Sequence, residues 1–257
     1  ETDWRINSSE RSLAAFKTIM KDPIFSSSGE AMAQFTAPAQ QPVKRTALAL
    51  KAPSPIKIDG NLNDWKKTSP ISMKDPTFFK EGLVWGGPAD LAGNAYIMWD
   101  ANYFYLAAQI TDSMPMVNKK EKQDVWNGDA IELVMSAKPG ADEKRESFDL
   151  TDYQFGFGTG DGKTIKPTIW NWQRRRTPGG SEIVVKKTAK PLGYVIEAKI
   201  PWSFFTNGFV PSSGTRTGFD IAFDDSDKTG EREKQFIWNG DYYFYKDPSV
   251  WGTLEFK

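Results

Sequence analysis

The sequence predicts an all-β protein, an antiparallel β-sandwich of the immunoglobulin or jelly-roll type that follows a mostly irregular N-terminal arm. From about residue 46, short segments rich in aromatic and β-branched residues recur, and Gly, Pro, Asn and Asp separate them. No long helical period follows residue 45. Many short strands with closely spaced turns favour a sandwich. The sequence has no visible internal repeat, which disfavours a propeller or a solenoid.

Residues 1–45 are expected to form an arm or linker ahead of a domain at residues 46–257. A short amphipathic helix is predicted over residues 9–20, because three apolar residues there share one helical face: Leu13, Phe16 and Met20. The small and polar residues that follow, up to Pro42, are typical of a linker. The arm either packs on the main domain or tethers it to another module or surface protein.

The strands of the main domain are expected in ten segments: Ala95–Trp99, Tyr103–Thr111, Ala130–Met135, Tyr153–Phe157, Thr168–Trp172, Glu182–Thr188, Gly193–Lys199, Gly218–Phe223, Gln235–Trp238 and Gly252–Phe256. Each is rich in residues that favour strands. The segment Asp100–Asn102 is predicted to close a tight hairpin, and Leu192-Gly193 is predicted to link two later strands.

The composition excludes several functions. The 257 residues include 33 Lys+Arg and 33 Asp+Glu, so the net charge is zero. This argues against binding of nucleic acid or an anionic membrane through the overall charge of the protein. With no Cys and no His, disulfides, thiolate sites, Ser-His-Asp triads and His-ligated metals are ruled out. The sequence contains no run of 18 apolar residues, so it predicts no membrane-spanning helix. The start at Glu1, without a leader, indicates a processed or cut chain.

Aromatic residues in two loops point to a binding site. Trp126 stands in a polar loop just before the strand at Ala130–Met135, where strand alternation does not place its ring. The segment from Tyr242 to Trp251 likewise crowds aromatic residues into a loop. Exposed aromatic rings on loops are functional candidates, and the apolar face of a sugar stacks on such rings. Two facing rings would form a slot.

Two acidic segments are candidates for structural calcium, which prefers six to eight oxygen ligands. The first carries Asp59, Asn61 and Asn63 at alternating positions, and the second carries Asp224, Asp225 and Asp227. The alternative readings are a polar turn before a buried Trp for the first segment and a solvated hairpin tip for the second.

Catalysis finds little support. Asp129 and Glu132 form a carboxylate pair of the kind that a glycosidase needs, but residues three apart in a strand point to opposite faces. The indoles of Trp170 and Trp172 share one strand face, and three arginines follow at 174–176. We interpret this group as a core strand with a basic edge in preference to a ligand site. The protein is therefore not expected to be an enzyme.

From about Pro55 to Lys257 the chain resembles carbohydrate-binding module family 9. The resemblance rests on the order and spacing of five anchors: Ile58-Asp59-Gly60 with Asp64-Trp65, Trp99–Tyr105 with Asp112, Trp126–Glu132, Gly193–Trp202 and Asp247–Leu254.

The resemblance implies non-catalytic binding of an oligosaccharide or polysaccharide between two rings, at positions that Trp126 and Tyr245 take here. It also implies that Glu132 bonds sugar hydroxyls, and we expect Lys246 beside Tyr245 to be a further polar contact. The strand that supplies an Arg and an Asn in sugar-binding members has Gly156 and Gly158 at those positions, so that half of the site is expected to be missing or rebuilt. Structural calcium and a secreted, periplasmic or cell-surface location are implied as well.

Two alternatives stay open at this point. The same superfamily includes b-type haem domains, for which only a Met–Lys ligand pair is available here, such as Met114 or Met116 with Lys119 or Lys246. Other members are structural or partner-binding modules of exported assemblies without a sugar ligand, and the arm of residues 1–45 is consistent with that role.

Overall fold

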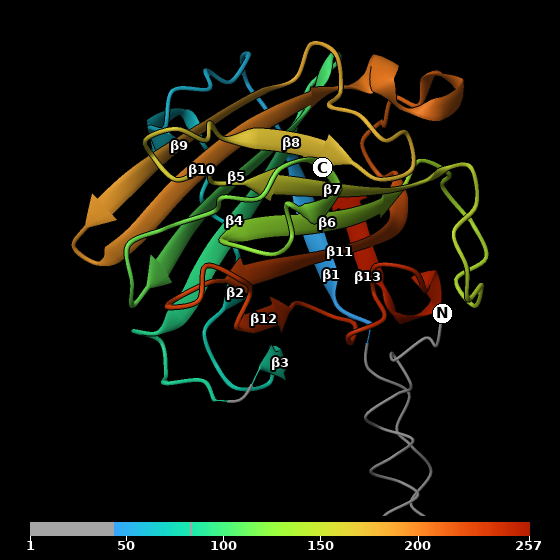
Figure 1. Cartoon of the computed structure of the whole chain (residues 1–257). Coiled ribbons are helices and arrows are strands. Elements are labelled where there is room, and N and C mark those ends of the chain that lie inside the picture. Colours follow the sequence, from blue (N-terminus) through green and yellow to red (C-terminus); the bar gives the residue numbers. More distant parts are fainter. Residues whose placement is uncertain (1–43, 83) are drawn as a thin grey trace, which may run out of the picture. The chain divides into compact units, whose positions relative to one another are not determined.

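A computed structural model describes residues 44–82 and 84–257 and confirms the all-β class (Figure 1). Its strands are β1 Thr46–Lys51, β2 Ile71–Met73, β3 Phe79–Gly82, β4 Leu91–Trp99, β5 Tyr103–Asp112, β6 Ala130–Ser136, β7 Asp152–Gly158, β8 Thr168–Asn171, β9 Glu182–Ala189, β10 Leu192–Pro201, β11 Arg216–Asp225, β12 Lys234–Ile237 and β13 Gly252–Phe256. The helical elements are short 3₁₀ turns: η1 Leu62–Asp64, η2 Lys122–Asp124, η3 Trp202–Phe204, η4 Thr206–Gly208 and η5 Pro248–Val250. The helix expected at residues 9–20 lies outside the described residues.

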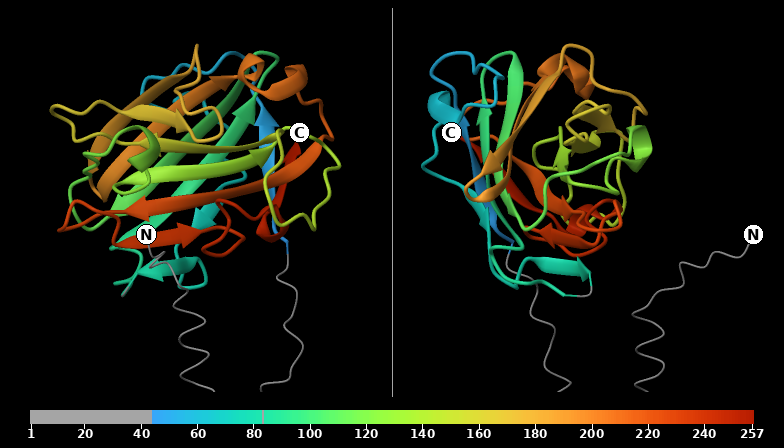
Figure 2. Two further views of the ribbon diagram at one scale, coloured as in Figure 1. Left: turned by 45° about the vertical axis from the view of Figure 1, so that its right-hand side comes forward. Right: turned by 60° about the vertical axis from the view of Figure 1, so that its left-hand side comes forward.

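The strands form one hydrogen-bonded sheet in the order β8-β7-β6-β11-β13-β1-β4-β5-β10-β9. Figure 2 shows this sheet folding back on itself, so that β4 and β5 in one wall face β6 and β11 in the other. The expectation of a purely antiparallel arrangement is corrected at β1, which pairs in parallel with both β13 and β4. This strand joins the two walls along one edge. No helix in the described part of the chain has the length and apolarity needed to cross a membrane.

All ten expected strands are present, and three short ones were missed. The missed strands are β1, β2 and β3. The hairpin at Asp100–Asn102 is confirmed, since the Asp100 N–H donates to the Tyr103 carbonyl over 3.1 Å. The link between β9 and β10 lies at Lys190-Pro191, two residues earlier than expected, because Leu192 and Gly193 already pair with β9.

Strand alternation decides which side chains of β6 reach the core. Ile131, Leu133 and Met135 point inward and are fully buried among the aromatic side chains of both walls. Glu132 and Val134 therefore lie on the outer face of the same strand. Burying a large apolar side chain stabilises the fold by about 1.5–3 kcal/mol, so the register of β6 is strongly specified.

The C-terminal aromatic segment covers only part of this outer face. Phe244 and Trp251 form a small apolar cluster with Val134 of β6 and Ala222 of β11, and Tyr245 packs against it. The Trp251 indole nitrogen donates to the Phe244 carbonyl over 2.6 Å, which fixes the segment. The neighbouring part of the face, towards the start of β6, carries polar side chains instead.

Candidate functional site

The polar part of the outer face is built by sheet register. Glu132 of β6 stands opposite Ala222 of β11 and Gly156 of β7. Two residues further along β11, Asp224 stands opposite Gln235 of β12. Because period-2 alternation gives these side chains the same face, two acids from separate strands come together.

Glu132 and Asp224 share their hydrogen-bond donors. The Gln235 amide donates to Glu132 Oε1 over 3.1 Å and to Asp224 Oδ1 over 2.8 Å. Arg232 Nη1 lies 3.1 Å from the same Asp224 oxygen and 3.5 Å from Glu132 Oε1. On its other side, Glu132 Oε2 accepts from the Gln154 amide over 2.6 Å. The network fixes both carboxylates in one orientation.

Burial favours the neutral forms of Glu132 and Asp224 over their charged forms. Glu132 is 4% exposed and Asp224 is 1% exposed. Burial raises the pKa of Glu132, and burial together with the Glu132 charge raises the pKa of Asp224 well above its usual range. Asp224 Oδ2 is buried without a hydrogen-bond partner, so the pair retains unused acceptor capacity.

Trp126 lies next to this network, as expected for a ring in a loop. Its side chain is 36% exposed, and the guanidinium carbon of Arg232 lies 4.8 Å from its ring centre. The adjacent Asn127 holds the arginine by accepting from the Arg232 backbone N–H over 2.7 Å. The outer nitrogen of Arg232 pairs with Glu81 of β3. Arg232 therefore links the aromatic ring to three carboxylates.

The two glycines of β7 have a packing cause. A Cβ atom at Gly156 would collide with the side chains of Val125 and Trp172, and one at Gly158 would collide with Val125. Trp172 is held there by its indole nitrogen, which donates to the Gln123 carbonyl over 3.0 Å. Larger side chains are thus excluded from these two positions of β7. The polar side chains beside Glu132 come instead from Gln154 of β7, Glu81 of β3, Asp224 of β11, Gln235 of β12 and Arg232 of the loop between β11 and β12.

Tyr245 and Lys246 lie further along the same face. Tyr245 packs on the cluster that includes Val134 and Ala222, the neighbours of Glu132 and Asp224 along their strands. The Lys246 ammonium lies 4.5 Å from the ring centre of Tyr243 and 5.8 Å from that of Tyr245. Tyr245 thus contacts the apolar cluster beside the polar network, whereas Trp126 contacts Arg232 of the network itself.

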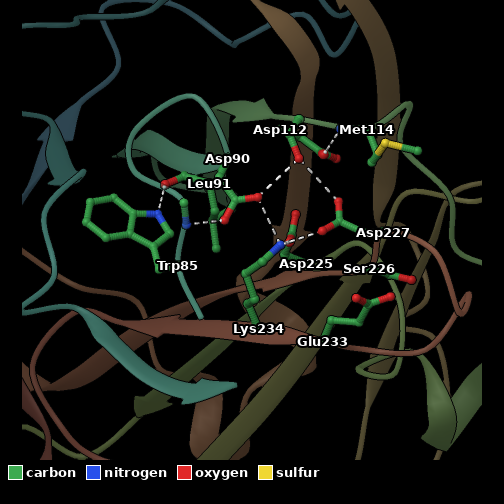
Figure 3. Close-up of polar contacts among 12 residues, drawn as sticks. Trp85, Asp90, Leu91, Asp112, Met114, Asp225, Ser226, Asp227, Glu233 and Lys234 are labelled. Atoms are coloured by element: carbon green, nitrogen blue, oxygen red, sulfur yellow. Dashed lines mark hydrogen bonds and ion pairs between the residues drawn. The ribbon is translucent and has the colours of Figure 1, made fainter. Parts of the chain in front are cut away.

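The second acidic segment divides between the two faces of β11. Asp224 contacts Arg232 of the outer network. Its neighbour Asp225 points the other way, and Figure 3 shows it beside Lys234. The Lys234 ammonium lies 2.5 Å from Asp225, 2.6 Å from Asp227 and 3.1 Å from Asp90. The expected trio therefore does not converge: Asp225 and Asp227 meet an ammonium, and Asp224 is absent from that group.

A deeper acidic group adjoins this lysine. One carboxylate oxygen from each of Asp112, Asp129 and Asp225 lies within 4.8 Å of the others. Burial raises the pKa of Asp112 to about 6 and that of Asp225 to about 7, and it raises the pKa of Asp129 well above its usual range. Asp112 Oδ2 and Ser226 Oγ, both buried, have no hydrogen-bond partner. Asp129 and Glu132 lie on opposite faces, as expected.

The first acidic segment wraps around a carboxylate. Glu197 Oε2 accepts from the backbone N–H groups of Asp59 and Asn61 over 3.0 and 3.1 Å. Its other oxygen accepts from the Trp65 indole over 2.5 Å. Asp59 itself pairs with Lys57 over 2.9 Å. The loop thus directs amide hydrogens at an anion, whereas a calcium site would need converging oxygens.

The remaining candidates have structural roles. Arg174 lies over the rings of Tyr153 and Phe204, at 5.7 and 5.6 Å from their centres, and Arg176 lies over Phe204 as well.

For the haem alternative, Met116 is buried in the main core, whereas Lys246 lies over the tyrosines of the outer face. A cavity of about 220 Å³ beside Lys44, Arg145 and Arg216 is also present, but these cations are each already paired with an acid.

Comparisons with known proteins identify the family of the fold. A family model described as carbohydrate family 9 binding domain-like matches residues 58–257. Endo-1,4-beta-xylanase A of Thermotoga maritima is 27% identical over 203 residues, which are 77% of this chain and 16% of the relative. Exoglucanase XynX of Acetivibrio thermocellus is 26% identical over 203 residues, again 77% of this chain and 16% of the relative. The chain thus spans about one sixth of the length of these curated relatives.

Solved structures show the same fold. A family 9 carbohydrate-binding module from Caldicellulosiruptor kristjanssonii in complex with glucose matches with a TM-score of 0.57 and 18% identity, over 83% of this chain and 96% of the other. A second structure of a module from that organism, in complex with cellotriose, matches with a TM-score of 0.57 and 17% identity, over 83% and 94% of the two chains.

Proposed function

Since the chain belongs to the carbohydrate family 9 binding domain-like family, we propose that it is a non-catalytic module that binds a sugar on the outer face of β6, β11 and β12. Trp126 and Tyr245 flank the site, and Glu132 and Lys246 are its expected polar contacts. The observation that supports this most directly is the half-exposed Trp126 ring beside a buried acid network with unused acceptor capacity. Sugars offer what such a site lacks: an apolar face for a ring and hydroxyl donors for carboxylates.

A binding role also agrees with the chemistry of the network. Glu132 and Asp224 share donors on one side of the site, so neither stands alone as an acid opposite a base. We propose that the module works outside the cytoplasm, joined to or associated with other modules, since the curated relatives are glycanases that are much longer than this chain. We also propose that the two facing walls of the sheet form a β-sandwich.

Calorimetric titration with glucose, cellotriose and xylotriose tests the function. We expect at least one of them to bind, and Trp126→Ala to reduce that affinity at least tenfold with little change in melting temperature. The matched control is Tyr103→Ala, because Tyr103 is a half-buried ring with the Lys199 ammonium 4.8 Å from its centre, remote from Glu132. Equal losses in the two variants would contradict the site, and no binding by the wild-type chain to any glycan on an array would contradict the function.

We further propose structural calcium at Asp112, Asp129 and Asp225. The donor set is all oxygen, which suits Ca²⁺, and Asp112 Oδ2 is a buried acceptor without a partner. Lys234 pairs with Asp90, Asp225 and Asp227, so Asp225 would be shared between the lysine and the ion. A calcium concentration a hundredfold above the dissociation constant would stabilise the fold by about 2.7 kcal/mol.

Melting curves with EDTA and with millimolar calcium test the calcium proposal. Calcium is expected to raise the midpoint of the wild-type chain and to have much less effect on Asp112→Asn. The control is Asp59→Asn, since the Asp59 loop surrounds Glu197. Identical midpoints with and without calcium, and no calcium in elemental analysis, would contradict the proposal.

A further inference from the structure

The charge balance beside Trp126 is uneven. Three carboxylates surround the single guanidinium of Arg232, and they come from three strands: Glu81 of β3, Glu132 of β6 and Asp224 of β11. The two other side chains of the network, Gln154 and Gln235, are neutral amides. The acids of this part of the site therefore outnumber its cations.

Both terminal nitrogens of Arg232 are already paired with acids. Nη1 is taken by Asp224 and Glu132 in the floor of the site, and Nη2 is taken by Glu81. The Arg232 side chain is only 10% exposed, whereas that of Glu81 is 40% exposed. Glu81 thus stands between the guanidinium and the solvent, at the rim of the network.

Glu81 is held at the rim by backbone pairing. It stands opposite Gln235 in the pairing of β3 with β12, which puts its side chain on the same face as the acid pair. Asn127 fixes the arginine backbone on the other side. Both partners of the ion pair are therefore positioned independently of any ligand, as a specificity element requires.

We propose that Glu81 sets the charge selectivity of the sugar site, so that the site accepts neutral sugars and rejects sugars with a carboxylate. An anionic sugar would need a free guanidinium edge, since bidentate pairing with Arg is the strong form of carboxylate recognition. Glu81 takes Nη2, one of the nitrogens that such a pairing would use, and adds a negative charge of its own. Repulsive elements of this kind exclude wrong partners at little cost to the right one.

This inference rests on the proposed function and is tested with glucose and glucuronate, which differ at one carbon. Titrations at pH 7 and low salt are made with the full chain, with Glu81→Gln and with Glu231→Gln. Glu231 is the matched control, because it is an exposed neighbour of Arg232 that pairs with Lys120 over 3.0 Å. Gln keeps the size of the side chain and removes only its charge.

The wild-type chain is expected to bind glucose at least tenfold more tightly than glucuronate. Glu81→Gln should reduce this ratio to about threefold or less, mainly through tighter binding of glucuronate, and Glu231→Gln should leave it unchanged. Glu81→Ala, which also frees the guanidinium, should lower the ratio in the same way. It replaces Glu81→Gln in the experiment if the melting temperature of the Gln variant is too low for titration.

Equal binding of the two sugars by the wild-type chain, or an unchanged ratio in both Glu81 variants, would overturn the role of Glu81 while the sugar site stands. If the wild-type chain binds neither sugar and Trp126→Ala changes nothing on other neutral glycans, the proposed function fails and the charge selectivity fails with it.

Discussion

The guanidinium of Arg232 lies 4.8 Å from the ring centre of Trp126, between that ring and the buried carboxylates of Glu132 and Asp224. A cation at this distance over an indole is attracted by the ring, by about 0.5–2 kcal/mol depending on burial. The contact orients the ring that is proposed to stack on a sugar. It also joins two loops that are more than a hundred residues apart in the chain.

Arg232→Lys is expected to weaken sugar binding about tenfold and to lower the melting temperature by several degrees. A lysine ammonium is a point charge, and it cannot serve Glu81, Asp224 and the Trp126 face together as a planar guanidinium does. Calorimetric titration and thermal melts measure both effects. Arg216→Lys is the control, because Arg216 forms an exposed pair with Glu255 at 2.8 Å, and a comparable loss there would contradict the role of Arg232.

Gly156→Ala is expected to destabilise the fold by about 1–3 kcal/mol, the usual cost of overpacking a tight site. The added methyl group would displace Val125 and Trp172, which lie against the glycine, and would disturb the loop that carries Trp126. Urea unfolding gives the free energy. Gly179→Ala is the matched control, since nothing lies within 4 Å of a Cβ atom there. Similar free energies for the two variants would show that β7 has room.

Glu197→Gln is expected to reduce the free energy of unfolding by about 3 kcal/mol. The carboxylate accepts from the backbone N–H groups of Asp59, Gly60 and Asn61 with one oxygen and from the Trp65 indole with the other. Gln keeps only one acceptor oxygen, and its amide nitrogen cannot accept the bonds made to the other. Glu255→Gln breaks only exposed ion pairs and should cost less than about 1 kcal/mol. Denaturant titration compares the two variants, and an equal cost would refute the anchoring role of Glu197.

Asp220 is expected to make stability fall as the pH rises from about 4 to 7. Burial raises its pKa from 3.8 to about 7 in the folded chain, against the opposing effect of backbone N–H groups of Gly240, Asn239 and Ile221. Between these two values the folded state binds a proton that the unfolded state does not bind. The stabilisation is therefore complete below the unfolded pKa and is lost as the pH passes through the folded pKa.

Comparison with Asp220→Asn isolates this effect. The variant loses a side-chain acceptor for these backbone N–H groups, which lowers its stability by a constant amount. Its stability should lack the pH-dependent part, which amounts to at most about 4 kcal/mol for a shift of this size. Urea unfolding at pH 4, 5.5, 7 and 8 gives the difference between the two chains. A difference that does not change with pH would show that Asp220 has an ordinary pKa.

Local composition was sufficient for ten of the thirteen strands in the described part of the chain, because aromatic and β-branched residues between turn residues favour strands. In β6, Ile131, Leu133 and Met135 lie in the main core, whereas Glu132 and Val134 lie on the other face. Trp126 was likewise visible as a ring in a polar loop outside any alternation. The anchors from Ile58 to Leu254 predicted the family, which the match over residues 58–257 confirms.

Only the tertiary structure decided which polar residues meet. Asp224 and Asp225 are neighbours in the chain, yet they serve opposite faces, because consecutive side chains of a strand point in opposite directions. Glu81, Glu132 and Arg232 are far apart in the chain, and they converge through the pairing of β3 with β12, of β12 with β11 and of β11 with β6. Register between distant strands depends on the packing of the whole core, and no local pattern carries it.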